Sequence, residues 1–173
     1  MVRAAVGSRA AAAVDPESPV VTLAASDEDA RRMARRLEAV GFRDLRGILA
    51  GGIEAWRDAG LPVESVDSIP AERLAELLRE RDVLLLDVRD PDEWAEGHVP
   101  GSIRIPYQQL RGPALDQLAG STNGTPIAVA CGAGNRSGLA ASLLRRAGVR
   151  NVIHVNEGVD RLATHGIPLT QEV

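Results

Sequence analysis

The sequence predicts an α/β protein: a three-layer α/β/α sandwich on a mostly parallel five-stranded sheet, with an added partial βαβα repeat. Short apolar runs alternate with amphipathic segments, which is typical of strands joined by helices in a parallel sheet. One run, residues 83–86, is wholly apolar, as expected of a strand buried on both faces. A length of 173 residues is enough for one well-cored domain and a smaller second part.

The composition excludes several functional classes. The net charge is −4 and aromatic residues make up 2% of the chain, so we expect no nucleic-acid partner. No apolar run approaches the ~20 residues of a membrane span, and the start of the chain lacks the apolar core of a secretory signal. A single cysteine excludes an internal disulfide framework and fits a reducing compartment, so we expect a cytoplasmic protein.

The chain begins with a tail and a partial module. Residues 1–18 are rich in alanine, and we expect a poorly ordered tail there, with a short Ala-rich helix as the alternative. Residues 19–64 are expected to form strand, helix, strand and helix in that order. The first of these helices ends with Arg35 and Arg36 before Gly41, which is the usual chemistry of a helix C-terminus.

Residues 19–64 repeat the pattern of the last third of the chain. The segments that match are residues 20–24 with 127–131, residues 41–45 with 148–152, and, after a one-residue slip, residues 61–63 with 167–169. We therefore predict that residues 19–64 are a partial copy of a domain that is complete in residues 65–173.

The complete copy has a front half of its own. A helix is expected from Pro70, with Leu74, Leu77 and Leu78 on one face, and a buried strand follows within residues 82–89. A short acidic helix, a short strand, a partly helical segment and a loop are expected at residues 91–96, 103–106, 107–118 and 121–124. The next apolar run ends at Cys131, which places this thiol at the carboxyl edge of the sheet, where α/β proteins bind ligands.

Cys131 opens a small-residue loop that leads into an amphipathic helix. Backbone N–H groups at a helix N-terminus point at an anion, and the helix dipole favours negative charge there. Such settings lower a cysteine pKa from ~8.5 to about 3.5–7.5. We therefore predict Cys131 as a catalytic nucleophile, the alternative being a small, inert core residue.

The residues after Cys131 are predicted to bind the substrate. Gly132, Ala133 and Gly134 are small, so the backbone can approach an anion closely and adopt positive φ. Arg136 is expected to add positive potential to the loop, and Ser137 to cap the following helix. The predicted binding set is Gly132, Ala133, Gly134, Asn135, Arg136 and Ser137.

Three motifs in residues 65–173 carry a resemblance to a known family. They are Leu86-Asp87-Val88-Arg89 with Glu93-Trp94, then Glu96-Gly97-His98-Val99-Pro100-Gly101-Ser102, and then Cys131-x-x-Gly134-x-Arg136-Ser137. Over nearly its whole length this region resembles a rhodanese domain. Residues 19–64 resemble the back half of a second rhodanese module and include the family's glycine pair and tryptophan at residues 51–56. In the complete module the corresponding residues, 158–162, lack the second glycine and the tryptophan that are usual in the family. They lie outside the thiol loop, so this difference concerns packing rather than chemistry.

The resemblance implies a sulfurtransferase. A Cys131 thiolate would take sulfane sulfur from a donor such as thiosulfate, form a persulfide, and pass the sulfur to a thiol or cyanide acceptor. Arg136 would stabilise the sulfur-bearing anion or bind an oxyanion of the donor. We expect neither a cofactor nor a metal, since His154 and His165 are isolated in the sequence. The related dual-specificity phosphatases have a loop one residue longer and a histidine where this chain has Ala130, so the resemblance argues against phosphatase or arsenate reductase activity.

The partial copy is predicted to be inactive. Ala24 stands at the cysteine position, and Asp27, Glu28 and Asp29 follow where an anion cradle would lie. An inert copy usually serves packing or recognition, so the alternative function is a non-turnover persulfide carrier or interaction module that docks to a partner enzyme. The active module, a second chain or upstream sequence of a larger fusion protein would cover the apolar side chains of residues 19–64, which makes a dimer or a partner enzyme an expectation.

Other polar and aromatic residues are expected to support the fold. His98 lies in a Gly-His-x-Pro-Gly turn, which favours a structural hydrogen bond over a catalytic base. An ion-pair network near the site is expected from Asp87, Arg89 and Glu93. Packing is the expected role of the two tryptophans, Trp56 and Trp94.

Overall fold

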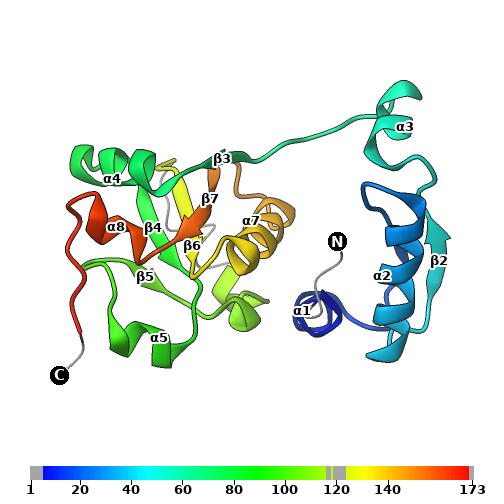
Figure 1. The fold of residues 1–173 in the computed structure, drawn as a ribbon, viewed down its shortest axis with the longest axis horizontal. Coiled ribbons are helices and arrows are strands. Elements are labelled where there is room, and N and C mark those ends of the chain that lie inside the picture. The colour runs from blue at the N-terminus through cyan, green and yellow to red at the C-terminus, as the bar shows by residue number, and fades with distance from the viewer. Residues whose placement is uncertain (1–5, 116–117, 119–123, 172–173) are drawn as a thin grey trace. The chain divides into compact units, whose positions relative to one another are not determined.

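A computed structural model describes residues 6–115, 118 and 124–171 of the protein. The chain divides into two compact units, residues 1–65 and residues 66–173, and each is described by itself. Figure 1 shows the helices and strands of both units and labels them where there is room.

The second unit is built on a parallel sheet of five strands, which confirms the predicted fold class. The strands in spatial order are β3 (Asp67–Ile69), β7 (Val152–Gly158), β6 (Ile127–Cys131), β4 (Leu84–Asp87) and β5 (Ile103–Arg104). All four neighbouring pairs are parallel. The central strand β6 is buried at every residue, because helices cover both of its faces.

Helices cover the two faces of this sheet (Figure 1). The helices α4 (Ala71–Glu80) and α8 (Arg161–Thr164) lie on one side, and α7 (Asn135–Arg146) lies on the other. Two shorter elements, α5 (Pro91–Glu96) and the 3-10 helix η1 (Tyr107–Gln109), follow β4 and β5. The core under α4 and α8 includes Leu74, Leu85, Val155 and Leu162, which are all buried. This arrangement is the predicted three-layer sandwich.

The helix boundaries follow local chemistry. The start of α4 is satisfied from the sheet, since the Ala71 N–H donates to the Glu157 carboxylate at 2.8 Å. Asp90 caps α5 in a capping box, in which Glu93 accepts from the Asp90 N–H at 3.1 Å. The helical segment predicted within residues 107–118 includes η1 and the helical residues 113–115 and 118. The loop predicted at 121–124 lies, except for Gly124, outside the described residues.

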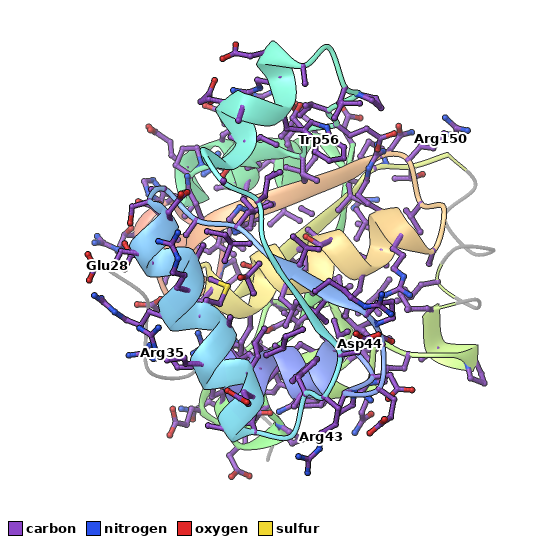
Figure 2. The ribbon with its side chains drawn as sticks, turned by 90° about the vertical axis from the view of Figure 1, so that its right-hand side faces the viewer. Glu28, Arg35, Arg43, Asp44, Trp56 and Arg150 are labelled. Carbon is purple, nitrogen blue, oxygen red and sulfur yellow. The ribbon has the colours of Figure 1, made fainter. Side chains whose placement is uncertain are left out.

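The first unit contains α1 (Val6–Ala13), β1 (Val20–Thr22), α2 (Asp27–Ala39), β2 (Leu45–Ile48) and α3 (Gly52–Asp58). The two strands are parallel, and α2 packs on one face of them, where Thr22 Oγ1 donates to the Ala30 carbonyl at 3.0 Å. In Figure 1, α1 and β2 lie on opposite sides of α2. Figure 2 shows Glu28 and Arg35 pointing outward from α2.

The segment predicted as a poorly ordered tail therefore contains the helix α1, which is the alternative that its alanine content allows. Contact with α2 supplies the packing that so short a helix needs, since Gly7 lies against the Arg36 carbonyl and the Val40 side chain. Residues 1–5 of the predicted tail lie outside the described part. That residues 19–64 are a partial, inactive copy of the domain in residues 65–173 stays a prediction.

Candidate functional site

Cys131 ends the central strand β6 and lies at the N-terminus of α7, as the sequence predicts. The thiol is buried, with the residue 1% exposed, and its loop runs through Gly132, Ala133 and Gly134 before α7 begins at Asn135. The Asn135 side chain folds back over this loop and donates to the Ala133 carbonyl at 3.4 Å. The structure therefore places the predicted site residues in one continuous turn between a buried strand and a helix.

Two glycines are required by the path of this turn. Gly134 has φ +77°, and a Cβ there would lie 2.6 Å from the Asn156 carbonyl oxygen on β7. Gly158, at the end of β7, is equally confined, because a Cβ on it would lie 2.6 Å from the Gly132 carbonyl oxygen. Gly158 was not among the predicted site residues, and only the pairing of β6 with β7 reveals its role.

The surroundings of Cys131 favour its thiolate. Burial is the largest single effect and raises its pKa, but hydrogen bonds outweigh burial and leave the pKa below its ordinary value. The donors are the Ser137 hydroxyl and the backbone N–H groups of Ala133, Ser137 and Arg136. These donors converge at the N-terminus of α7, so they stabilise a negative charge on the sulfur.

Ser137 is not the helix cap that the sequence predicts. Gly134 occupies the N-cap position in the left-handed conformation, so Ser137 falls within the first turn of α7 and is fully buried. Its Oγ lies 3.4 Å from Cys131 Sγ and 3.1 Å from the Val155 carbonyl oxygen, to which it donates. In this position the hydroxyl oxygen accepts a hydrogen bond from the Cys131 thiol. Once the thiol has lost its proton, the hydroxyl O–H can turn from Val155 to the sulfur and stabilise the thiolate.

Arg136 is held by two carboxylates from the segment after β4. Its Nη2 donates to Glu93 Oε1 at 2.7 Å, and its Nη1 contacts Glu93 Oε2 and lies 3.0 Å from Asp90 Oδ2. The guanidinium lowers the pKa of Glu93, and Glu93 in turn raises that of Arg136. These contacts link the cysteine loop to α5. Because the two carboxylates balance its charge, Arg136 supplies hydrogen-bond donors rather than an unopposed positive charge.

The predicted network of Asp87, Arg89 and Glu93 forms two separate groups. Asp87 and Arg89 make a buried bidentate ion pair with Nη2 to Oδ2 at 2.7 Å, and Arg89 also donates to the Gly97 carbonyl at 2.7 Å. The Glu93 carboxylate instead pairs with Arg136, and only its backbone carbonyl accepts from Arg89, at 3.3 Å. The first group fixes the end of β4 to the turn after α5, and the second fixes the cysteine loop.

His154 contacts the cysteine loop, which sequence reasoning missed. From β7 its Nε2 lies 2.9 Å from the Gly134 carbonyl oxygen, and its Nδ1 lies 3.2 Å from Ser68 Oγ on β3. Because a carbonyl oxygen can only accept, Nε2 donates to Gly134, and Nδ1 shares the other hydrogen bond with the Ser68 hydroxyl. These contacts of His154 depend on the register of β3, β7 and β6, so no local sequence motif reveals them. His98 has its Nδ1 3.1 Å from the Trp94 carbonyl oxygen, which agrees with a structural role.

Within the described part of the chain, His, Cys, Asp and Glu side chains form no cluster of three suited to a metal ion. No described helix is long and apolar enough to cross a membrane.

The fold and the cysteine loop define a known class of protein. Residues 70–165 match the family of the rhodanese-like domain, which is more than half of the chain. The protein therefore belongs to the rhodanese-like family. A rhodanese-related protein from Thermoplasma volcanium, whose crystal structure is known, superposes with a TM-score of 0.52 at 31% identity over 61% of this chain and 99% of that chain.

Relatives named as sulfurtransferases match the same region. A sulfurtransferase of Allochromatium vinosum is 30% identical over 105 residues, which cover 60% of this chain and 94% of the relative. The thiosulfate sulfurtransferase GlpE of Pseudomonas syringae is 33% identical over 92 residues, which cover 53% and 82% of the two chains. An uncharacterized protein of Synechocystis is 34% identical over 99 residues, and the match spans only 53% of its length.

Proposed function

We propose that this protein is a sulfurtransferase that moves sulfane sulfur from a donor such as thiosulfate to a thiol or cyanide acceptor through a persulfide on Cys131. The observation that carries the proposal is the buried Cys131 thiol, whose pKa is lowered by the Ser137 hydroxyl and by N–H donors at the start of α7. The names of the Allochromatium and Pseudomonas relatives support the same chemistry.

The first step forms the persulfide. The Cys131 thiolate attacks the outer sulfur of thiosulfate, the bond from that sulfur to the sulfonate sulfur breaks, and sulfite leaves with the electron pair. The terminal persulfide sulfur then carries the negative charge, which the loop N–H groups stabilise. Because these donors are fixed before the reaction by α7 and by the ion pairs of Arg136, little reorganisation is needed.

The second step returns the thiolate. A nucleophilic acceptor attacks the terminal sulfur, the sulfur–sulfur bond to Cys131 breaks, and Cys131 Sγ keeps the bonding pair. With cyanide as acceptor the product is thiocyanate, and with a thiolate it is the acceptor's persulfide. The first step oxidises the Cys131 thiolate to a persulfide at the expense of thiosulfate, and the second step returns the thiolate, so the full cycle requires no further oxidant or reductant.

The alternative function is a carrier that takes up sulfur and releases it only to a docked partner enzyme. The first unit favours this alternative, because its Ala24 has no thiol and its acids serve local structure. Asp27 accepts from the Gly51 N–H at 2.9 Å, and Ser26 caps α2 by accepting from the Asp29 N–H at 3.1 Å. A segment so arranged is suited to recognition rather than to sulfur chemistry.

Intact-mass analysis distinguishes the two functions. The full chain is incubated with thiosulfate, separated from it, and then mixed with cyanide or a small thiol. Gain and then loss of one sulfur atom is the result expected of a sulfurtransferase. Stable gain that no small acceptor removes indicates a carrier, and absence of any gain overturns both.

A further inference from the structure

Large hydrophobic side chains are exposed on the first unit. Among the residues that the structure describes, the exposed ones are Val21, Leu23, Val40, Ile53, Leu61 and Val63. The extreme cases are Val21, 56% exposed, and Leu23, 47% exposed. Side chains alternate along a strand, so Thr22 faces α2 while Val21 and Leu23 face the other side of the β1–β2 pair. This second side of the two-stranded sheet is an open apolar face.

The second unit shows what such a face looks like when it is covered. In the two sheets the parallel pairs begin with Val20 opposite Leu45 and with Ile127 opposite Val152, which are the residues that the sequence repeat aligns. The helices after them end alike, since the Leu61 N–H donates to the Trp56 carbonyl and the Ile167 N–H donates to the Leu162 carbonyl. Residues of the first unit can therefore be paired with counterparts in the second.

The counterparts of the exposed side chains are buried or partly buried. Val21 and Leu23 correspond to Ala128 and Ala130, both 0% exposed. The remaining three, Ile53, Leu61 and Val63, correspond to Val159, Ile167 and Leu169, which belong to or pack against the same core cluster. Of the exposed group, only Val40, near α1, falls outside this correspondence.

That cluster is completed by the front half of the second unit. The helix α4 covers the face with Leu74 and Ala75, β4 pairs with the free side of β6, and β3 pairs with the free side of β7. In the described part of the first unit, β1 pairs only with β2, so neither strand has such a neighbour. An unpaired parallel strand edge beside an apolar face is a template for an added strand.

We infer that the open face of the first unit, formed by Val21, Leu23, Ile53, Leu61 and Val63, is a docking surface for a strand–helix–strand element like β3–α4–β4, presented by another polypeptide segment. Such an element pairs one strand with each free edge and lays a helix with a leucine and alanine stripe across the face. This inference concerns recognition and is independent of the chemistry at Cys131.

Hydrogen exchange on a lengthened chain tests the inference. A second copy of residues 66–125 is inserted between Ser18 and Pro19, so that Thr125 leads into Pro19 as it leads into Pro126 in the natural chain. Burial of one Val or Leu side chain stabilises the strand enough to slow its local opening about tenfold or more. Because the inserted copy covers both Val21 and Leu23, the backbone amides of residues 20–23 should exchange at least about a hundredfold more slowly than in the unaltered chain. The same insertion with Leu74→Asp in the inserted copy should not slow them. Equal exchange in both lengthened chains overturns the inference.

The unaltered chain supplies a second test. The double substitution Val21→Ser and Leu23→Ser should leave the thermal unfolding temperature of the chain unchanged, because both side chains are already exposed. The matched pair Ala128→Ser and Ala130→Ser should lower that temperature, because both side chains are buried. The inference is overturned if the first pair destabilises the chain, or if residues 20–23 exchange as slowly as residues 127–131. A concentration-dependent dimer that protects residues 20–23 overturns it as well, because the occupant is then a second copy of the same face.

Discussion

Replacing Ser137 with alanine should raise the pKa of the Cys131 thiol. The Ser137 hydroxyl is the strongest of the hydrogen-bond partners that lower this pKa, and its Oγ lies 3.4 Å from Sγ. A hydrogen bond to a charged group contributes about 1.5–3 kcal/mol, and the hydroxyl gives up a neutral bond of about 0.5–1.5 kcal/mol to Val155 when it turns to the thiolate. Taking the middle of each range, the net loss of thiolate stability is about 1–1.5 kcal/mol.

The assay is the rate of alkylation by iodoacetamide as a function of pH. A loss of about 1–1.5 kcal/mol corresponds to about a tenfold lower thiolate population below the pKa, and so to about a tenfold slower alkylation there. The control is Ser142→Ala, which removes a hydroxyl from an exposed position on the same helix, where it donates to the Gly138 carbonyl at 3.1 Å. If Ser137→Ala and Ser142→Ala give the same pH profile, the thiolate is not stabilised by Ser137 and the account of the site fails.

Three further substitutions test the supports of the cysteine loop. Glu93→Gln should lower the stability to urea at neutral pH and lower it less in acid. The Arg136 guanidinium depresses the Glu93 pKa, so the stability gained from this pair is lost as the pH falls through the depressed value. An equal effect at neutral and acid pH would contradict this. Gly158→Ala should abolish sulfur uptake with an unchanged circular dichroism spectrum, because its Cβ would lie 2.6 Å from the Gly132 carbonyl oxygen. Gly138→Ala is the matched control, since its Cβ meets only an ordinary contact at 3.6 Å. His154→Ala should slow persulfide formation up to about tenfold by removing a neutral hydrogen bond to the loop, measured by quenched mass analysis, and an unchanged rate would show that the loop holds its shape without it.

The sequence predicted those features that depend on neighbouring residues. The buried strand β6 is recognisable because five apolar or small residues follow one another, and the turn after it because Gly132, Ala133 and Gly134 are small. Family motifs then identified the fold around them. The local turn also limited the prediction, because Gly134 takes the cap position in the left-handed conformation and moves Ser137 inside α7.

Features that depend on strand register or on distant pairs were not predictable. His154 meets Gly134 only because β7 lies between β3 and β6, and β3 itself is three residues long with a polar start at Asp67. The pairing of Glu93 with Arg136 joins residues 43 positions apart, so the sequence showed both charges but not which ones pair. The open face of the first unit likewise became visible only when its strands were compared with β6 and β7.

Cys131 is the residue proposed to carry the sulfur. The most direct measurement is the sulfite released when the full chain is mixed with excess thiosulfate, first without acceptor and then with cyanide. We predict one equivalent of sulfite per chain without acceptor, continued release with thiocyanate formed in step when cyanide is present, and neither product from Cys131→Ser. Sulfite release by the Cys131→Ser variant, or thiocyanate formed without a preceding equivalent of sulfite, would contradict the account.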